Sequence, residues 1–520
     1  MACCENRGGP RATPREAHDH VRRVMFLVLA FGVRLIFLFI APNNGTDACA
    51  RLMIARALMK NPFRLPSAVW LPLHFWLLSL SLWVWDSEWS ARFLTLLLGA
   101  GTILPYWGVV RRSFDRRVAY YSTLMFALFG FHIGYSVTTS SEAPTVFFLA
   151  SGVYAWVRLR EDEGWRWLIA GGGALSAASL CRYEAWVYVP ILSVFLLDFS
   201  QGLRSAWSNR SAWRRALGFG AIASVGAVGW IVYSLVRWGH AFAAADRTFV
   251  LNATDLLTVK HSRLYTFLVV PGASLISLGP FIAGLGICGV LWVIRGRTLP
   301  AAGLATLALG SGGAHYYAAV AKNVTMARYT LIYSWLLFPF AFEALRLLSR
   351  RWREQSVRKA FLSVAVLTLA WEAGIVLGAH RLPATVADKL AVVSPTLPLP
   401  SEIRGLTGWL KAHTASTDSI IVDEFNYESG DIARFSAIPQ SRAFCVPRRG
   451  SGGEIDRLIS DFVNTRHPRL LVYCERGVLG TLWKLSDADE AEVPALGLRL
   501  RKLWEGQSYR VYVIEDSGHN

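Results

Sequence analysis

A series of apolar runs, separated by short loops that carry arginine, constrains this chain most strongly. Several runs extend over about 18 or more residues without a charge, which is the length that an α-helix needs to cross a bilayer. Hydrophobic residues make up 53% of the 520 residues and charged residues only 17%. These features predict a mainly α, polytopic helical membrane protein. Residues 1–23 show no signal-peptide cleavage site before the first run, so we expect that run to remain as a helix.

The arginines indicate how the helices are oriented. A net charge of +18 would suit nucleic-acid binding, but the basic residues cluster in short loops between apolar runs. The enrichment of Lys and Arg in cytoplasmic loops explains this pattern more simply. We therefore expect membrane lipids and no nucleic acid as partners. The Arg-bearing residues 1–23 are predicted to form a cytoplasmic tail of a multi-pass protein in a bacterial inner membrane or a plasma membrane.

The apolar run Trp70–Trp85 decides the topology. It has only 16 residues and contains Pro72 and His74. If it crossed the membrane, the later basic loops would lie outside; if it lies in the interface, they fall on the cytoplasmic side. The charge bias favours an interfacial segment. The basic loops concerned are 111–117, 158–166, 199–215, 295–297 and 346–359.

With this topology the chain has about eleven spans, each long enough for most or all of a crossing. They are 24–42, 92–110, 118–134, 143–157, 167–181, 184–198, 216–237, 266–294, 299–320, 329–347 and 360–379. The outer side then receives the loops 43–91, 135–142, 181–184, 238–265 and 321–328, and everything after about residue 380.

The composition changes after residue 380. Residues 381–401 form a Pro-bearing linker, and 402–520 are predicted to be an extracytoplasmic soluble α/β domain, large enough to bury its own core. The multi-span domain is thus 24–380. A helix is expected at EIRGLTGWLKAH, short buried strands at SIIVDE and LLVYC, and a strand pair at LRLRKLW and YRVYVIE. The carboxylates of 418–431 are interpreted as a solvated strand end. Cys445 and Cys474 could pair, but two buried thiols are favoured.

The stretch NNGTDACAR (43–51) directly follows the first span and holds Asp47. A carboxylate beside lipid is costly, which makes Asp47 a functional candidate. The structural alternative is that Asp47 caps the following amphipathic helix and pairs with Arg51, four residues later. Glu142 stands at the outer start of a later span, where it could also be an ordinary helix cap. Two carboxylates from separate helices could converge on one catalytic or metal site.

Further polar residues stand at the outer ends of spans. His74 is either a ligand or an interface anchor, and Arg182 and Glu184 in the turn CRYEAW either act on a substrate or neutralise each other. Lys322 and Arg328 flank the loop 321–328. They could snorkel to headgroups, or they could form a cationic clamp for a phosphate at the membrane surface.

Taken in order, these features resemble the membrane glycosyltransferases of the C superfamily (GT-C). The branch indicated is that of dolichyl-phosphate-mannose protein mannosyltransferases and the lipid A aminoarabinose transferase. The resemblance covers roughly 24–350 and rests on Asp47 after the first helix, WLPLH (70–74), Arg92 before the second helix, Glu142 and the pair Arg328–Tyr329. The chain departs from the pattern in three places. Ala48 replaces a second acid, Glu142 replaces an Asp, and Trp70–Leu71 replace a charged pair.

The resemblance implies an inverting hexosyl- or pentosyltransferase. It would move a sugar from a polyprenyl-phosphate donor to a hydroxyl of a glycan, lipid or protein acceptor. Asp47 and Glu142 would be catalytic, and Arg328, Arg182 and Lys322 would bind the donor phosphate. The implied substrate contacts are His74, Arg92, Tyr183, Glu184 and Tyr329. No cofactor is required with certainty, and a divalent cation is left open.

Two other classes compete with this interpretation. A transporter or lipid flippase should carry charges buried in mid-span and broken helices in two repeated halves. The sequence shows no repeated halves, and its notable charges are assigned to span ends. The other alternative is a non-catalytic membrane subunit of a glycan assembly complex, which nothing in the sequence excludes.

Overall fold

The chain divides into two compact units, one of residues 1–43 and 54–378 and the other of residues 44–53 and 379–520. The first is a bundle of helices, and the second is built on a β-sheet. The computed structural model describes residues 14–41, 43, 48–63, 65, 70–162, 164–197, 207–241, 263–296, 299–322, 327–350, 352–378, 401–423, 432–433, 436–439, 442–446, 452–475, 477–485 and 489–515.

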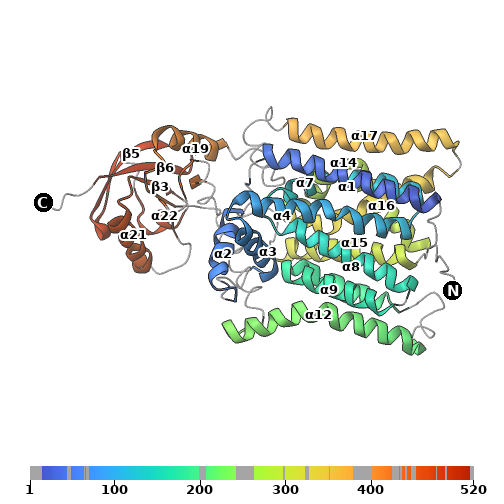
Figure 1. The fold of residues 1–520 in the computed structure, drawn as a ribbon. Helices are drawn as coiled ribbons and strands as arrows, with labels where there is room; N and C mark the ends of the chain where they lie inside the picture. The colour runs from blue at the N-terminus through green and yellow to red at the C-terminus, as the bar shows by residue number, and fades with distance from the viewer. Residues whose placement is uncertain are drawn as a thin grey trace, which may run out of the picture. The chain divides into compact units, whose positions relative to one another are not determined.

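Long helices run side by side through the first unit (Figure 1). The helical elements of this unit are α1 (Pro14–Ile40), α2 (Ala48–Lys60, which begins in the second unit), α3 (Pro72–Val84), α4 (Glu88–Gly101), α5 (Ile103–Ser113), α6 (Arg116–Ala127), α7 (Gly130–Ser136), α8 (Glu142–Asp162), α9 (Trp165–Cys181), η1 (Tyr183–Val187), α10 (Tyr188–Val194), α12 (Arg210–Trp238), α14 (Arg263–Gly296), α15 (Leu299–Lys322), η3 (Ala327–Thr330), α16 (Leu331–Leu348) and α17 (Glu354–Gly378).

Each predicted span falls on one helix or on two consecutive helices. Among the described residues, five helical stretches are long and apolar enough to cross a membrane: Asp19–Ile40, Glu88–Ser113, Arg210–Trp238, Phe267–Arg295 and Arg328–Leu348. The predicted polytopic helical fold is therefore confirmed.

Ion pairs gather the basic loops at one end of the bundle. They join the start of α1, the turn between α5 and α6, the end of α8 and the start of α17. The pairs are Arg111–Asp19 (3.2 Å), Arg116–Asp19 (3.1 Å), Arg112–Glu161 (2.9 Å) and Arg117–Glu354. We refer to this as the basic end.

A hydrogen bond at the opposite end of the bundle shows how the chain runs between α1 and α4. Arg92, in α4, donates from Nη2 to the carbonyl oxygen of Ala41 at 2.7 Å. Ala41 directly follows α1, so the end of α1 and the start of α4 lie together, and the chain between them makes no net crossing. With 13 residues, α3 is about 20 Å long, too short for a hydrocarbon core of about 30 Å. The prediction that 70–85 is not a span is confirmed.

The second unit contains a six-stranded mixed sheet in the order β2-β1-β3-β6-β5-β4. β1 is parallel to β2 and β3, and the remaining neighbours are antiparallel. The predicted helix, buried strands and terminal strand pair are all present. The elements are α19 (Ser401–His413), β1 (Ile420–Val422), β2 (Ala443–Cys445), α21 (Gly452–Arg466), β3 (Leu470–Cys474), α22 (Val478–Leu482), β4 (Glu490–Val493), η6 (Pro494–Leu496), β5 (Leu498–Glu505) and β6 (Tyr509–Glu515).

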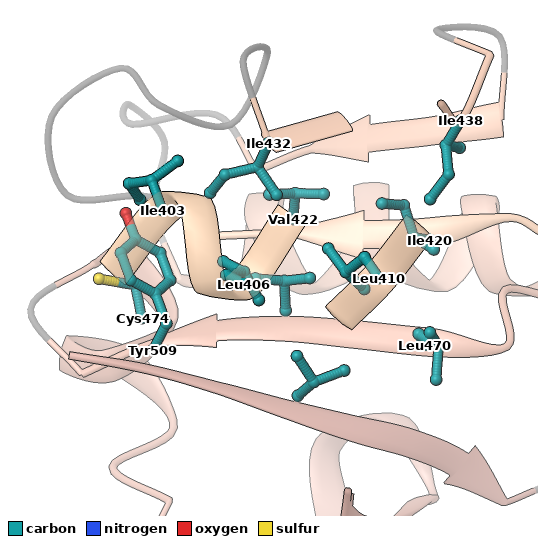
Figure 2. Close-up of a cluster of buried hydrophobic side chains, with 12 residues drawn as sticks. Ile403, Leu406, Leu410, Ile420, Val422, Ile432, Ile438, Leu470, Cys474 and Tyr509 are labelled. Carbon is teal, nitrogen blue, oxygen red and sulfur yellow. The ribbon is translucent and has the colours of Figure 1, made fainter. Parts of the chain in front are cut away.

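Both faces of this sheet are covered, which explains why its central strands are apolar without alternation. Leu406 and Leu410 of α19 pack on Ile420 and Leu470 on one face (Figure 2). Side chains of α21 and α22 pack on the other face, against residues such as Leu471. The α/β fold predicted for this region is confirmed.

Two details of this unit concern the sequence predictions. Cys445 and Cys474 are free thiols, as favoured; Cys474 is buried as predicted, whereas Cys445 is only partly buried. The interpretation of 418–431 as a solvated strand end is wrong for Asp423, which is fully buried. Its two carboxylate oxygens accept from the backbone N–H groups of Val478 and Leu479, each at 3.0 Å. Asp423 is buried because it caps the N-terminus of α22, whose first N–H groups have no partner within the helix.

Close contact between α14 and α16 depends on Gly289. A Cβ atom at this position would lie 2.0 Å from the carbonyl oxygen of Phe340, which is backbone and cannot swing away. Small residues allow membrane helices to approach in this way. Gly284, on the same helix, has no atom within 4 Å of such a Cβ and is exposed.

We therefore expect Gly289→Ala to lower the apparent melting temperature in detergent, because separating the helices costs about 1–3 kcal/mol. Gly284→Ala adds the same methyl group to the same helix and should leave the melting temperature unchanged. Differential scanning fluorimetry of the two variants measures this difference. Equal melting temperatures would show that the α14–α16 contact is not close-packed.

Candidate active site

The connection between α7 and α8, together with the first residue of α8, makes up residues 137–142 (VTTSSE) and lies at the end of the bundle away from the basic end. All six residues are buried. Polar side chains from several helices converge on this 137–142 segment, some on its backbone and some on its last residue, Glu142. Buried polar groups of this kind need partners within the protein, and at membrane depth they mark functional sites.

The first half of the segment is held by its backbone. Asn43 accepts from the N–H of Thr139 at 2.9 Å, and its amide nitrogen donates to the Thr139 hydroxyl at 3.2 Å. His74 Nε2 lies 3.0 Å from the Thr139 carbonyl oxygen and must donate to it, because a carbonyl only accepts. Arg92 Nε donates to the carbonyl oxygen of Val137 at 2.7 Å.

These contacts place His74 and Arg92 as supports of the segment. Both were predicted to touch a substrate, and both are at most 3% exposed. Asn43 was not singled out in the sequence. It belongs to the same stretch as Asp47, so it anchors the start of that stretch to the 137–142 segment.

The second half of the segment ends in an ionic cluster around Glu142, which is 0% exposed. Arg182 Nη1 donates to Glu142 Oε1 at 2.6 Å and to the Ser141 hydroxyl at 3.3 Å. The other two nitrogens of Arg182 donate to the two carboxylate oxygens of Glu184, at 2.7 and 3.3 Å. Arg182 and Glu184 do neutralise each other, and Arg182 also joins the start of α8 to the end of α9.

Electrostatics stabilise the charged form of Arg182. Burial opposes the charge, yet the neighbouring carboxylates of Glu184 and Glu142 raise the pKa of the guanidinium above its usual value. Arg182 is therefore a permanent cation, and all three of its nitrogens are engaged with named partners.

Arg328 and Tyr329, in η3, complete the cluster from the other side. Arg328 Nε lies 3.6 Å from Glu142 Oε1, and the residue is 8% exposed. The ring of Tyr329 has the guanidinium of Arg182 at 4.8 Å and that of Arg328 at 5.8 Å from its centroid. Cations over an aromatic face are attracted to it. Arg328 is thus directed into the protein, which argues against a merely snorkelling side chain.

His315 extends this cluster into α15 and was missed in the sequence. Its ring centroid lies 5.6 Å from that of Tyr329 and 6.2 Å from that of Tyr333, and the residue is buried. Tyr333 in turn shares a hydrogen bond of 2.9 Å with Ser274 of α14. A histidine inside an apolar span was the available signal, since polar residues there face the interior of a bundle.

Tyr183 is directed toward a different set of neighbours. Its hydroxyl accepts from Trp230 Nε1 of α12 at 2.7 Å, and its ring lies 5.3 Å from that of Trp186. These residues belong to an apolar cluster that also includes Phe75 of α3. Tyr183 therefore attaches η1 to α12, within a cluster that also contacts α3.

Two predicted site residues lie beyond what the structure describes. Asp47 falls outside the described residues, and for Lys322 only its position at the end of α15 is described. In the part of the chain that is described, no three His, Cys, Asp or Glu side chains gather as metal ligands would. The described predicted residues Glu142, Arg182, Glu184, Arg328 and Tyr329 form one cluster; His74 and Arg92 form its support.

One assignment made from the sequence is wrong. Charges were placed only at span ends, yet Arg34 within α1 is buried and Glu372 within α17 is partly buried, and both helices match predicted spans. Arg34 is fully buried, with its guanidinium bonded within the protein. An arginine interrupting an apolar run was a visible signal for such a site.

We expect Glu142→Gln to destabilise the protein by about 3 kcal/mol or more, because it removes a fully buried counter-charge that two buried guanidiniums share. Glu184→Gln is the matched control: its side chain is 27% exposed, so solvent compensates, and about 1 kcal/mol or less is expected. Melting temperatures in detergent compare the two. A smaller loss for Glu142→Gln than for Glu184→Gln would contradict the central place of Glu142.

Comparison with known proteins connects this architecture to a superfamily. Residues 66–233 match the family model of dolichyl-phosphate-mannose-protein mannosyltransferases. No curated protein sequence matches the chain. The structure of ArnT from Cupriavidus metallidurans bound to undecaprenyl phosphate is similar, with a TM-score of 0.57 and 14% identity over 95% of this chain and 98% of that chain.

A second solved structure shows the same architecture at greater distance. The oligosaccharyltransferase from Archaeoglobus fulgidus, in the apo form, has a TM-score of 0.51 and 11% identity over 89% of this chain and 70% of that chain. At such identities the likeness establishes the fold. The resemblance indicated by the sequence is confirmed: this chain is an integral membrane protein with the fold of the GT-C glycosyltransferases.

Proposed function

We propose that this protein transfers a sugar from a polyprenyl-phosphate donor to an acceptor hydroxyl at the outer face of a membrane. The observation that carries the proposal is the buried cluster of Glu142, Arg182, Arg328 and Tyr329 at the end of the bundle away from the basic loops. The basic end would face the cytoplasm. The structurally similar protein from Cupriavidus binds undecaprenyl phosphate, a lipid phosphate of the expected class.

The proposal of a phosphate ligand rests on which cation of the cluster we assign to it, because the charges of the cluster balance. Arg182 and Arg328 carry two positive charges, and Glu142 and Glu184 carry two negative ones. Arg182 is engaged on all three nitrogens, so we assign it to holding the site together. Arg328 is the cation that we assign to the donor phosphate, with Lys322 at the end of α15 as a second one. A planar guanidinium can hold two phosphate oxygens at once.

The chemistry is an inverting displacement. The acceptor hydroxyl oxygen forms a bond to the anomeric carbon of the sugar as the bond from that carbon to the phosphate oxygen breaks. The bonding electrons leave with polyprenyl phosphate, and the hydroxyl proton passes to a base. We assign this base to Asp47, which follows the first helix. Cations fixed beside the phosphate stabilise the charge that develops there, which is usually a large contribution.

For Glu142 the contacts favour an anchoring role over proton transfer. A carboxylate held between two guanidiniums gains little by accepting a proton, since protonation would remove its attraction to both. A direct catalytic role for Glu142 stays a prediction. Tyr329, His74 and Arg92 then serve to place the cluster and the 137–142 segment.

The proposal is tested by incubating the purified protein with a panel of polyprenyl-phosphate hexoses and pentoses and measuring sugar transfer.

With a donor that gives transfer, we expect Asp47→Asn to lower kcat by roughly two to four orders of magnitude, because the general base is lost. Donor binding should remain within error of wild type. Movement of a sugar lipid across vesicles without any transfer would instead identify a transporter. Near-normal transfer by Asp47→Asn would exclude Asp47 as the base.

For the donor phosphate, Arg328→Lys should raise the KM for the donor, and Arg328→Ala should raise it further. Lysine keeps the charge but offers one ammonium in place of a planar fork. The KM for the acceptor should not change in either variant. Arg237, near the end of α12 and exposed, provides the control, and Arg237→Lys should behave as wild type. Equal donor KM values for wild type and Arg328→Lys would rule out the phosphate contact.

A further inference from the structure

The helical path between the basic end and the 137–142 segment is interrupted inside the bundle. α6 ends at Ala127, and α7 begins at Gly130. Phe129 precedes α7 in an extended conformation and provides no side-chain cap. Such a break exposes carbonyl groups at the end of one helix and N–H groups at the start of the next. In a bilayer these groups must be satisfied by other parts of the protein.

Arg34 of α1 satisfies the carbonyl side of the break. Its Nη1 donates to the carbonyl oxygen of Ala127 at 2.9 Å, and its Nη2 lies 2.8 Å from Nδ1 of His132. Its Nε donates to the hydroxyl of Ser136 at 3.3 Å. A guanidinium only donates, so His132 Nδ1 accepts and its Nε2 carries the hydrogen. Arg34 therefore ties the last residue of α6 to two residues of α7 that lie one turn apart.

Glu372 of α17 satisfies the N–H side. Its Oε2 accepts from the backbone N–H of Gly130 at 2.6 Å, where no local side chain caps α7. A Cβ atom on Gly130 would lie 3.0 Å from the same oxygen, so the glycine lets the carboxylate approach. The break thus has a cation at the C-terminus of α6 and an acid at the N-terminus of α7, the arrangement that helix dipoles favour.

The position of α7 sets the position of the candidate active site. The helix ends at Ser136, and the next six residues are the 137–142 segment with Glu142. Ser136 is pressed against α4: a Cβ atom on Gly99 would lie 2.2 Å from its hydroxyl oxygen. A shift of α7 would therefore move the backbone to which Asn43, His74 and Arg92 are bonded.

We propose that Arg34 and Glu372 are positioning residues for the transfer reaction: by closing the α6–α7 break from two separate helices, they fix the depth of the 137–142 segment. This inference rests on the proposed function for its kinetic part and on the described contacts for its structural part. Neither residue touches the predicted donor site. Each acts through α7, and the acceptor oxygen of residue 372 matters more than its charge.

The test compares Glu372→Ala, Glu372→Gln and Arg34→Gln with Glu343→Gln. Glu343 is a nearly buried carboxylate of α16 that pairs with Arg346, so it controls for the loss of an acid from the bundle. Hydrogen–deuterium exchange of peptides covering 128–142, measured in detergent, reports the segment directly. We expect faster exchange in Glu372→Ala and Arg34→Gln, and wild-type exchange in Glu372→Gln and Glu343→Gln. Unchanged exchange in Glu372→Ala, or an equal rise in Glu343→Gln, would overturn the proposal.

Kinetics add a readout that a purely structural role would not give. A misplaced active-site segment should lower kcat roughly 10- to 100-fold in Glu372→Ala while the donor KM stays within about threefold, and Glu372→Gln should recover most of the rate. Loss of kcat in proportion to loss of folded protein would contradict this. If Glu372→Ala does not fold, Gly130→Ala replaces it, because its methyl group pushes the carboxylate away and should raise exchange likewise. If the wild type transfers no sugar, the proposed function fails while the exchange experiment still decides the role of the break.

Discussion

A bilayer offers no hydrogen-bond partners, so each polar group inside the bundle must find one within the protein. This requirement explains the most unusual contacts of the helical unit. Glu142 is buried because Arg182 and Arg328 approach it, and Arg34 is buried because two backbone carbonyls, a histidine and a serine accept from it. Apart from the bond of Arg34 to Ala30 within α1, these contacts join residues that are distant in the chain.

The same requirement makes the candidate active site rigid. Residues 137–141 lie between two helices, yet the N–H and the carbonyl oxygen of Thr139 are both hydrogen-bonded to side chains. Glu142, which follows them, is held by arginines. Fixed dipoles and charges of this kind need not reorganise when charge develops in a reaction. A pre-ordered segment held by Asn43 after α1, by side chains of α3 and α4 and by Arg182 after α9 would suit the proposed reaction, whose catalysis depends on placing a phosphate and a hydroxyl.

The ion pairs at the two ends of the bundle differ in how far they are exposed to solvent. At the basic end, ion pairs lie partly in solvent and contribute little each, as surface pairs generally do. At the other end, pairs such as Glu142–Arg182 are buried, and breaking them would leave an isolated charge in a medium of low dielectric constant. The first set joins the basic loops, and the second set holds the buried cluster around Glu142 together.

The sequence by itself determined which stretches form the main helices, that the apolar segment 70–85 is short, and where strands β1, β3, β5 and β6 lie, because hydrophobic length and periodicity are local properties. It also identified Glu142, Arg182, Arg328 and Tyr329, since each stands at the end of an apolar run. Only the tertiary structure decided that these four meet, that His74 and Arg92 support a backbone, and that Arg34 and Glu372 close a break between two other helices. Those pairings join helices that are far apart in the chain, and long-range packing, which no local pattern encodes, brings them together.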